Sequence, residues 1–195
     1  MRTIHTIGHS THSIERLIEL LTMHSISAVV DVRSSPYSRF NPQFNKEPLQ
    51  NALRNANIGY AFMGRELGAR SPVAECYING KVQFDLVAKT GLFRKGLERL
   101  KAGIDSCNSC LLCAEKDPLS CHRMVLVSRN LRSEDLRIEH ILDNGSVEDN
   151  RETEMRLRRE HHIDQSDLFA SDDELIEKAY ALQGEKVAYT EKNGE

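Results

Sequence analysis

Residues 111–123 read LLCAEKDPLSCHR, and the apolar run Met124–Leu131 follows them directly. The apolar start predicts a strand end, the polar middle with Pro118 predicts a loop, and the last part predicts a helix from about Ser120. Two thiols, two carboxylates, an imidazole and a guanidinium therefore gather at the end of one strand. Folding alone does not require so many reactive side chains in one place, so this unit indicates a functional site.

The size and composition are those of one globular domain, or of one domain with a C-terminal extension. The chain has 195 residues, of which 39% are hydrophobic and 28% are charged, so it can bury a core. Its formal net charge of -3 gives no overall attraction to nucleic acid, although local basic patches remain possible. We expect residues 1–145 to form an α/β domain that carries the site. Residues 146–195 are expected to form a charged helical extension packed on that domain.

The sequence carries no sign of export or membrane insertion. No apolar run approaches the roughly 20 residues that cross a bilayer, and the N-terminus leads directly into a strand-like pattern. We therefore expect no membrane partner and no signal peptide. The five cysteines are an odd number, and three of them lie within residues 107–113. This pattern favours a reducing compartment over a disulfide framework, so the expected location is cytoplasmic.

Short apolar runs alternate with helical patterns along the chain. This alternation predicts an α/β fold with three layers: a Rossmann-like, mostly parallel sheet with helices on both faces and a helical C-terminal extension. Stretches 34–48 and 64–80 are expected to be irregular. Strands are expected at 4–7, 28–33, 60–63, 111–114 and 138–142, and helices at 14–21, 47–57, 84–101, 122–131, 152–160 and 172–183.

Polar residues follow each of the first four expected strands. Ligands of parallel α/β sheets bind beyond the carboxyl ends of the strands, so these residues are expected to meet in a single site. They are His9 and Ser10 after the first strand, Asp31 and Arg33 at the second, Glu66 after the third, and Cys113 and Glu115 at the fourth.

Cys121 is the candidate nucleophile or redox thiol of this site. A helix N-terminus, His122 and Arg123 would each lower the pKa of its thiol, and Glu115 could transfer a proton. In a structural alternative, Cys121 packs as a small apolar residue and Arg123 pairs with Glu115 or Asp31. The expected catalytic residues are Cys121, Glu115, Asp31 and His9, and the expected substrate-binding residues are Ser10, Arg33, Arg39, Glu66, His122 and Arg123.

A metal site is a second interpretation of the cysteines. Cys107, Cys110, Cys113 and Cys121 have the spacing C-x2-C-x2-C-x7-C, and His122 adds a nitrogen ligand for zinc or iron. Against it, the odd offset between Cys110 and Cys113 places their side chains on opposite faces of a strand. A mixed set of His9, Asp31, Glu115 and His122 has suitable ligand types but no diagnostic spacing.

Two further stretches carry polar signals. The loop with Tyr37, Arg39, Phe40 and Phe44 interleaves aromatic and basic groups, which suits a nucleotide or a single nucleic-acid strand. The alternative is that its aromatic rings pack over the sheet. Arginines and histidines also cluster within residues 151–162, but glutamates interrupt them, which favours a solvated helix. The remaining histidines, taken as structural, are His5, His12, His24 and His140.

These motifs together resemble the bacterial domain of unknown function family 488. The resemblance rests on residues 6–10, Asp31-Val32-Arg33 with residues 36–39, Glu66-Leu67-Gly68, residues 113–123, and a tail that includes 140–145, Asp167-Leu168-Phe169 and 183–185. It implies a compact α/β domain and no settled activity. The motif positions that it implies are His9, Ser10, Asp31, Arg33, Arg39, Glu66, Cys113, Glu115, Cys121, His122 and Arg123.

Three functions therefore stay open. The leading hypothesis is an enzyme, a cysteine-dependent hydrolase or transferase, that acts on a small anionic substrate such as a nucleotide or a nucleic-acid component. The second is a nucleic-acid-binding or regulatory module without catalysis. The third is a protein that binds zinc or iron. The identity of the substrate within that class, the cofactor and the oligomeric state are not predicted.

Overall fold

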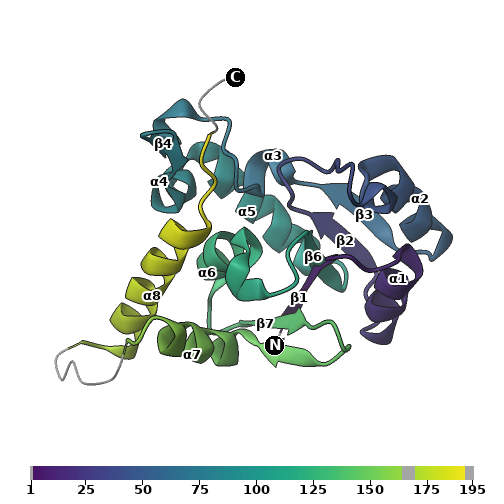
Figure 1. Ribbon diagram of the computed structural model, residues 1–195. Helices are drawn as coiled ribbons and strands as arrows, with labels where there is room; N and C mark the ends of the chain where they lie inside the picture. Colours follow the sequence, from purple (N-terminus) through teal and green to yellow (C-terminus); the bar gives the residue numbers. More distant parts are fainter. Residues whose placement is uncertain (1, 164–169, 192–195) are drawn as a thin grey trace.

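A six-stranded sheet with the strand order β3-β2-β6-β1-β7-β8 forms the centre of the computed structural model, which describes residues 2–163 and 170–191 (Figure 1). Five neighbouring strands are parallel, and the edge strand β8 runs antiparallel to β7. This confirms the α/β class. Asp167-Leu168-Phe169 of the family-like tail lies outside the described residues. The strands are β1 (Arg2–Gly8), β2 (Ala28–Asp31), β3 (Gly59–Phe62), β6 (Ser109–Cys113), β7 (Leu136–Ile141) and β8 (Val147–Asp149).

Helices cover both faces of the sheet, as expected for three layers (Figure 1). On one face, α1 (Ile14–Met23) and α2 (Lys46–Asn55) pack over a core that includes Cys110 and Leu112. On the other, α5 (Gly91–Ile104), a π-helix (Arg123–Ser128) and α6 (Arg129–Leu131) pack over a core that includes Leu111 and Cys113. Successive side chains of β6 thus point to opposite faces, as the sequence predicts.

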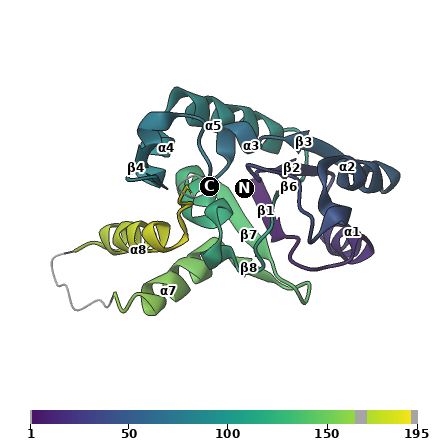
Figure 2. The same cartoon turned by 45° about the horizontal axis from the view of Figure 1, so that its top comes forward.

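Two helices follow the sheet, α7 (Asn150–Glu160) and α8 (Asp172–Val187), and lie side by side in both views (Figures 1 and 2). Ser171 caps α8, because its side chain accepts from Glu174 N while the Glu174 side chain accepts from Ser171 N. The face of α8 that carries Tyr180 is buried in the same core as α5. The Gln183 side chain donates to the carbonyl of Leu119, which ties α8 to the candidate-site loop.

The structure corrects three expectations. Residues 84–101 are two helices, α4 (Phe84–Lys89) and α5, because Thr90 has an extended backbone and its hydroxyl caps α5 by accepting from Phe93 N. Residues 64–80 are not wholly irregular, since they hold α3 (Gly64–Leu67) and, with residues 81–82, a hairpin of β4 (Tyr77–Ile78) and β5 (Lys81–Val82). The segment after β7 adds β8, which was not predicted. Within the described ranges, no helix is long and apolar enough to cross a membrane.

The register brings the carboxyl ends of three strands to one level. Gly8 of β1 lies beside Cys113 of β6, and Asp31 of β2 lies beside Leu112 of β6. Backbone bonds continue past the strand ends, with His9 N donating to Cys113 O and Val32 N to Leu112 O. The loops after β1, β2 and β6 are therefore tied together at a single edge, where a site was expected.

Candidate metal centre

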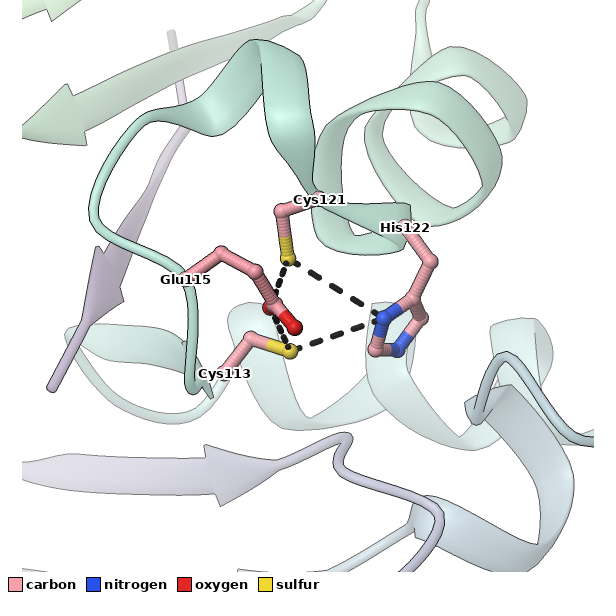
Figure 3. Close-up of side chains that lie close together, drawn as sticks. All are labelled: Cys113, Glu115, Cys121 and His122. Atoms are coloured by element: carbon pink, nitrogen blue, oxygen red, sulfur yellow. Dashed lines mark hydrogen bonds between the residues drawn. The ribbon is translucent and has the colours of Figure 1, made fainter. Parts of the chain in front are cut away.

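Four side chains at this edge point toward a common centre (Figure 3). Cys113 ends β6, and Glu115, Cys121 and His122 come from the loop and turn that follow. One ligand atom from each lies within 4.8 Å of all the others. Glu115 Oε2 lies 3.0 Å from Cys113 Sγ and 2.9 Å from Cys121 Sγ, and His122 Nδ1 lies 3.5 Å and 4.0 Å from the same two sulfurs. We call these four residues the Cys-Glu-Cys-His cluster.

The orientation of His122 is set from outside the cluster. Its Nε2 lies 2.9 Å from the carbonyl oxygen of Val32, the residue after β2. A carbonyl only accepts hydrogen bonds, so Nε2 carries a hydrogen and Nδ1 faces the sulfurs. Histidines that bind metals are usually held by such a bond at the other ring nitrogen. The backbone just after β2 therefore turns Nδ1 of His122 toward the cluster.

Burial and neighbouring charges shift the pKa values of the Cys121 and Cys113 thiols in opposite directions. Burial alone would raise the pKa of Cys121, but a hydrogen bond with Cys113 and the positive charges of Arg123 and His122 bring it well below its ordinary value. Burial and the neighbouring Cys121 raise the pKa of Cys113 well above its ordinary value. Partial burial and the charge of Cys121 also raise the pKa of Glu115. The cluster thus favours a thiolate at Cys121 beside a thiol that keeps its proton at Cys113.

Arg123 holds the loop of the cluster in place. Its Nη1 donates to Glu115 O at 2.6 Å, Nη2 to Lys116 O at 3.0 Å and Nε to Thr6 Oγ1 at 3.3 Å. The side chain is fully buried. Its own backbone N–H donates to Cys121 Sγ at 3.4 Å. All three guanidinium nitrogens are therefore engaged in protein contacts, which supports a positioning role.

Gly8 allows β1 to approach this loop. A Cβ atom at Gly8 would overlap the carbonyl oxygen of Glu115 and would lie 3.1 Å from Arg123 Nη1. Any other residue here would push the loop away from the strand. The close approach therefore explains why a glycine ends β1.

A second polar cluster lies beside the first, around Asp31. The Asp31 carboxylate accepts from Arg33 Nε at 2.9 Å, from Arg33 Nη2 at 2.7 Å and from the Tyr60 hydroxyl at 2.8 Å. Arg33 Nη1 lies 3.2 Å from His9 Nε2. Because a guanidinium only donates, Nε2 accepts, and His9 Nδ1 donates to Ser10 O. Burial lowers the pKa of His9 to about 4, so its ring is neutral and both nitrogens are occupied.

Comparison with protein families matches the model for the domain of unknown function DUF488 to residues 13–130, more than half of the chain. The chain belongs to the DUF488 family. No curated protein and no solved structure matches it. The matched range contains all four residues of the Cys-Glu-Cys-His cluster and Val32. The matched range begins after Gly8 and ends before β7. Residues that hold the loop of this DUF488 site in place, such as Thr6 and Gly8, therefore lie outside the matched range.

Three of the residues expected at the DUF488 site are not part of the Cys-Glu-Cys-His cluster. Glu66 Oε1 lies 3.0 Å from Arg99 Nη1 on α5 and does not join the cluster. Arg39 is exposed on the β2–α2 loop and makes no ion pair within residues 2–163 and 170–191. Ser10 follows β1 in a left-handed conformation, with φ of 48°, and its carbonyl holds His9.

Not all the cysteines of the proposed metal spacing meet. Cys110 packs on the opposite face of the sheet, and Cys107 contacts the Gly103 carbonyl and the Ser109 hydroxyl. A set that uses all four cysteines is therefore wrong. The cluster combines members of both metal sets that the sequence suggested.

A cavity of about 990 Å³ lies elsewhere in the DUF488 fold, between α6, α7, α8 and the β7–β8 edge. Its lining includes none of the four cluster residues. Its arginines are largely engaged: Arg129 and Arg132 both pair with Glu177, and Arg158 pairs with Asp172. The charges there balance one another, so we base the function on the cluster.

Proposed function

We propose that the Cys-Glu-Cys-His cluster binds a zinc ion and that the protein is a metal-dependent enzyme acting on a small anionic substrate. The observation that carries this proposal is the convergence of four donor atoms from Cys113, Glu115, Cys121 and His122 within 4.8 Å of one another. A tetrahedral zinc site with bonds of about 2.0–2.3 Å has edges of about 3.3–3.8 Å. Four of the six separations, from 2.9 to 4.0 Å, bracket that range, and all six lie within 4.8 Å.

The surroundings of the ligands support the same proposal. The bond from His122 Nε2 to Val32 O leaves Nδ1 for the ion. The backbone N–H of Arg123 stabilises a thiolate at Cys121. A bound ion would replace the protons on Cys113 and His122, because metal ligands bind in their deprotonated forms.

The exposed side of the cluster is where a substrate would react. Cys113, Cys121 and His122 are buried, whereas Glu115 is exposed. Three buried ligands and a fourth from an exposed residue, whose carboxylate is only partly buried, suit a site whose fourth position can open to water or substrate. Zinc would supply Lewis acidity there. Where the fourth position opens, Glu115 would be released from the ion, and with its raised pKa it would accept a proton from an attacking water and return it to the leaving group, which is the chemistry of a hydrolase.

A second candidate is that Cys121 itself is the nucleophile of a cysteine-dependent hydrolase or transferase. The lowered pKa of its thiol favours this, but the side chain is only 1% exposed. Alkylation separates the two proposals. A nucleophilic Cys121 would react with iodoacetamide at pH 6 in protein as purified. A zinc ligand would react only after the metal is removed with a chelator.

Metal content tests the leading proposal. Mass spectrometry under native conditions should find about one zinc per chain in the unmodified protein and in the control Cys110→Ser, whose side chain lies on the other face of β6. Cys113→Ser and His122→Ala should lose the metal. With cobalt in place of zinc, the thiolate absorption band should be present in Cys110→Ser and absent in Cys113→Ser.

Two results would overturn it. One is equal metal content in Cys113→Ser and Cys110→Ser. The other is unmodified protein that is folded, carries no metal and shows no rise in melting temperature when zinc is added, because binding to the folded state must stabilise it. The second measurement uses no variant, so it holds even where a substitution prevents folding.

A further inference from the structure

The β2–α2 loop, residues 32–45, begins and ends next to the Cys-Glu-Cys-His cluster. Its first residue, Val32, accepts the hydrogen bond from His122 Nε2. Near its end, the Phe44 ring stacks on His9 with 4.3 Å between ring centroids. His9 N in turn donates to Cys113 O. The loop is therefore bonded to the cluster at its start and is held near its end by His9, whose backbone is bonded to that of Cys113.

Polar contacts hold the tip of this loop in one shape. Ser38 N donates to Asn45 Oδ1 at 2.7 Å, and the Ser38 hydroxyl accepts from Phe40 N at 3.1 Å and from Asn41 N at 3.3 Å. The Gln43 side chain donates to the carbonyl of His12 at 3.1 Å. The backbone of the tip is thus braced against both its own helix and the loop after β1.

This braced tip displays two side chains that the fold does not use. Phe40 is 91% exposed, the most among the large hydrophobic residues that the structure describes. Its neighbour Arg39 is exposed and makes no ion pair within residues 2–163 and 170–191. An exposed aromatic ring and an exposed cation at consecutive positions of one loop are matched by a ligand that carries both a flat ring and a negative charge. Folding gains nothing from holding these two groups in water.

We propose that Arg39 and Phe40 clamp a nucleoside monophosphate, with the base stacked on Phe40 and the phosphate paired with Arg39. This rests on the proposed function, because the clamp would present the nucleotide to the metal cluster. Stacking on an aromatic side chain tolerates every base, so the clamp selects nucleotides as a class. A single nucleic-acid strand needs a groove with several cations, whereas this tip carries one.

Binding of AMP, ribose 5-phosphate and inorganic phosphate by isothermal titration calorimetry tests the clamp. Phe40→Ala should weaken AMP binding about tenfold and change ribose 5-phosphate binding less than twofold. Arg39→Gln should weaken both ligands several-fold. Met23→Ala, which removes another exposed apolar side chain at the end of α1, should change neither and serves as the control.

The proposal is overturned by equal AMP affinity in Phe40→Ala and the unmodified protein, or by no AMP binding at millimolar concentration. Tighter binding of a ten-nucleotide single strand, with steep dependence on salt, would also overturn it and assign the loop to nucleic acid. Metal content measured on the same samples separates the two proposals. Loss of AMP affinity in Phe40→Ala would support the clamp, and the metal centre would be rejected as well if the same unmodified protein carries no zinc and is not stabilised when zinc is added.

Discussion

His140 should make the stability of this protein depend on pH in a defined direction. It lies fully buried in β7, with Nδ1 2.7 Å from Thr6 Oγ1 and Nε2 3.1 Å from Asn150 Oδ1. Burial, assisted by the charge of Arg123, lowers its pKa from 6.5 to about 3. The unfolded chain therefore takes up a proton at this site before the folded chain does. The stabilisation is complete above pH 6.5 and is lost as the pH falls.

The size follows from the two pKa values. Each pH unit between them costs about 1.4 kcal/mol, and between pH 7 and pH 5 the free energy of unfolding should fall by about 2 kcal/mol through His140 alone. Urea unfolding followed by circular dichroism, at pH 7, 6 and 5 with a chelator present, measures this. His140→Gln should be less stable at pH 7 but should lose about 2 kcal/mol less between pH 7 and pH 5 than the unmodified protein.

The control is His162→Asn, because His162 is exposed and asparagine tolerates its left-handed backbone, with φ of 51°. Its pH profile should run parallel to that of the unmodified protein. Parallel profiles for His140→Gln as well would refute the reasoning, since they would mean that His140 is protonated equally in the folded and unfolded states. Taking differences between variants cancels the titration of the cluster itself.

Two substitutions beside the cluster have large expected effects. Gly8→Ala should lower zinc affinity at least tenfold and the melting temperature by several degrees, because the new methyl group displaces the Glu115 carbonyl; a chelator competition with unchanged affinity would contradict this. Asp31→Asn should cost about 3–5 kcal/mol in urea unfolding, because it leaves the buried Arg33 charge without its carboxylate. Tyr60→Phe, which removes one hydrogen bond to Asp31, should cost about 1 kcal/mol, and an equal loss in both variants would argue against a buried ion pair.

The sheet and the place of the site could be predicted because their signals are local. Residues 28–33, rich in β-branched side chains, predict a buried strand, and a parallel sheet places Asp31 and Cys113 at one edge. The separation of Cys110 from Cys113 follows from the two-residue period of a strand and is confirmed. Each of these conclusions needs only a few neighbouring residues.

The contacts that complete the site could not be predicted in this way. The Val32 carbonyl that orients His122 is a backbone group, and no residue type marks it in a sequence. Glu66 was assigned to the site, but α3 packs against α5 and places it beside Arg99. The Glu66 contact depends on tertiary packing, as does the π-helix after His122. The division of 84–101 depends instead on Thr90, whose capping role competes with continuing a helix.

The cluster is local in sequence but depends on distant strands for its shape. Its four side chains come from residues 113–122, yet His122 is held by the backbone after β2, and the loop carbonyls are held to β1 through Arg123 and Thr6. Thr6 in turn contacts His140 in β7. An ion that binds these four side chains must therefore stabilise the packing of β1, β2 and β7. Loosening any of these strands must in turn weaken the binding of the ion. A peptide of residues 111–131 would carry every ligand, but it would bind zinc more weakly than the whole chain, because nothing in it replaces Val32 or Thr6.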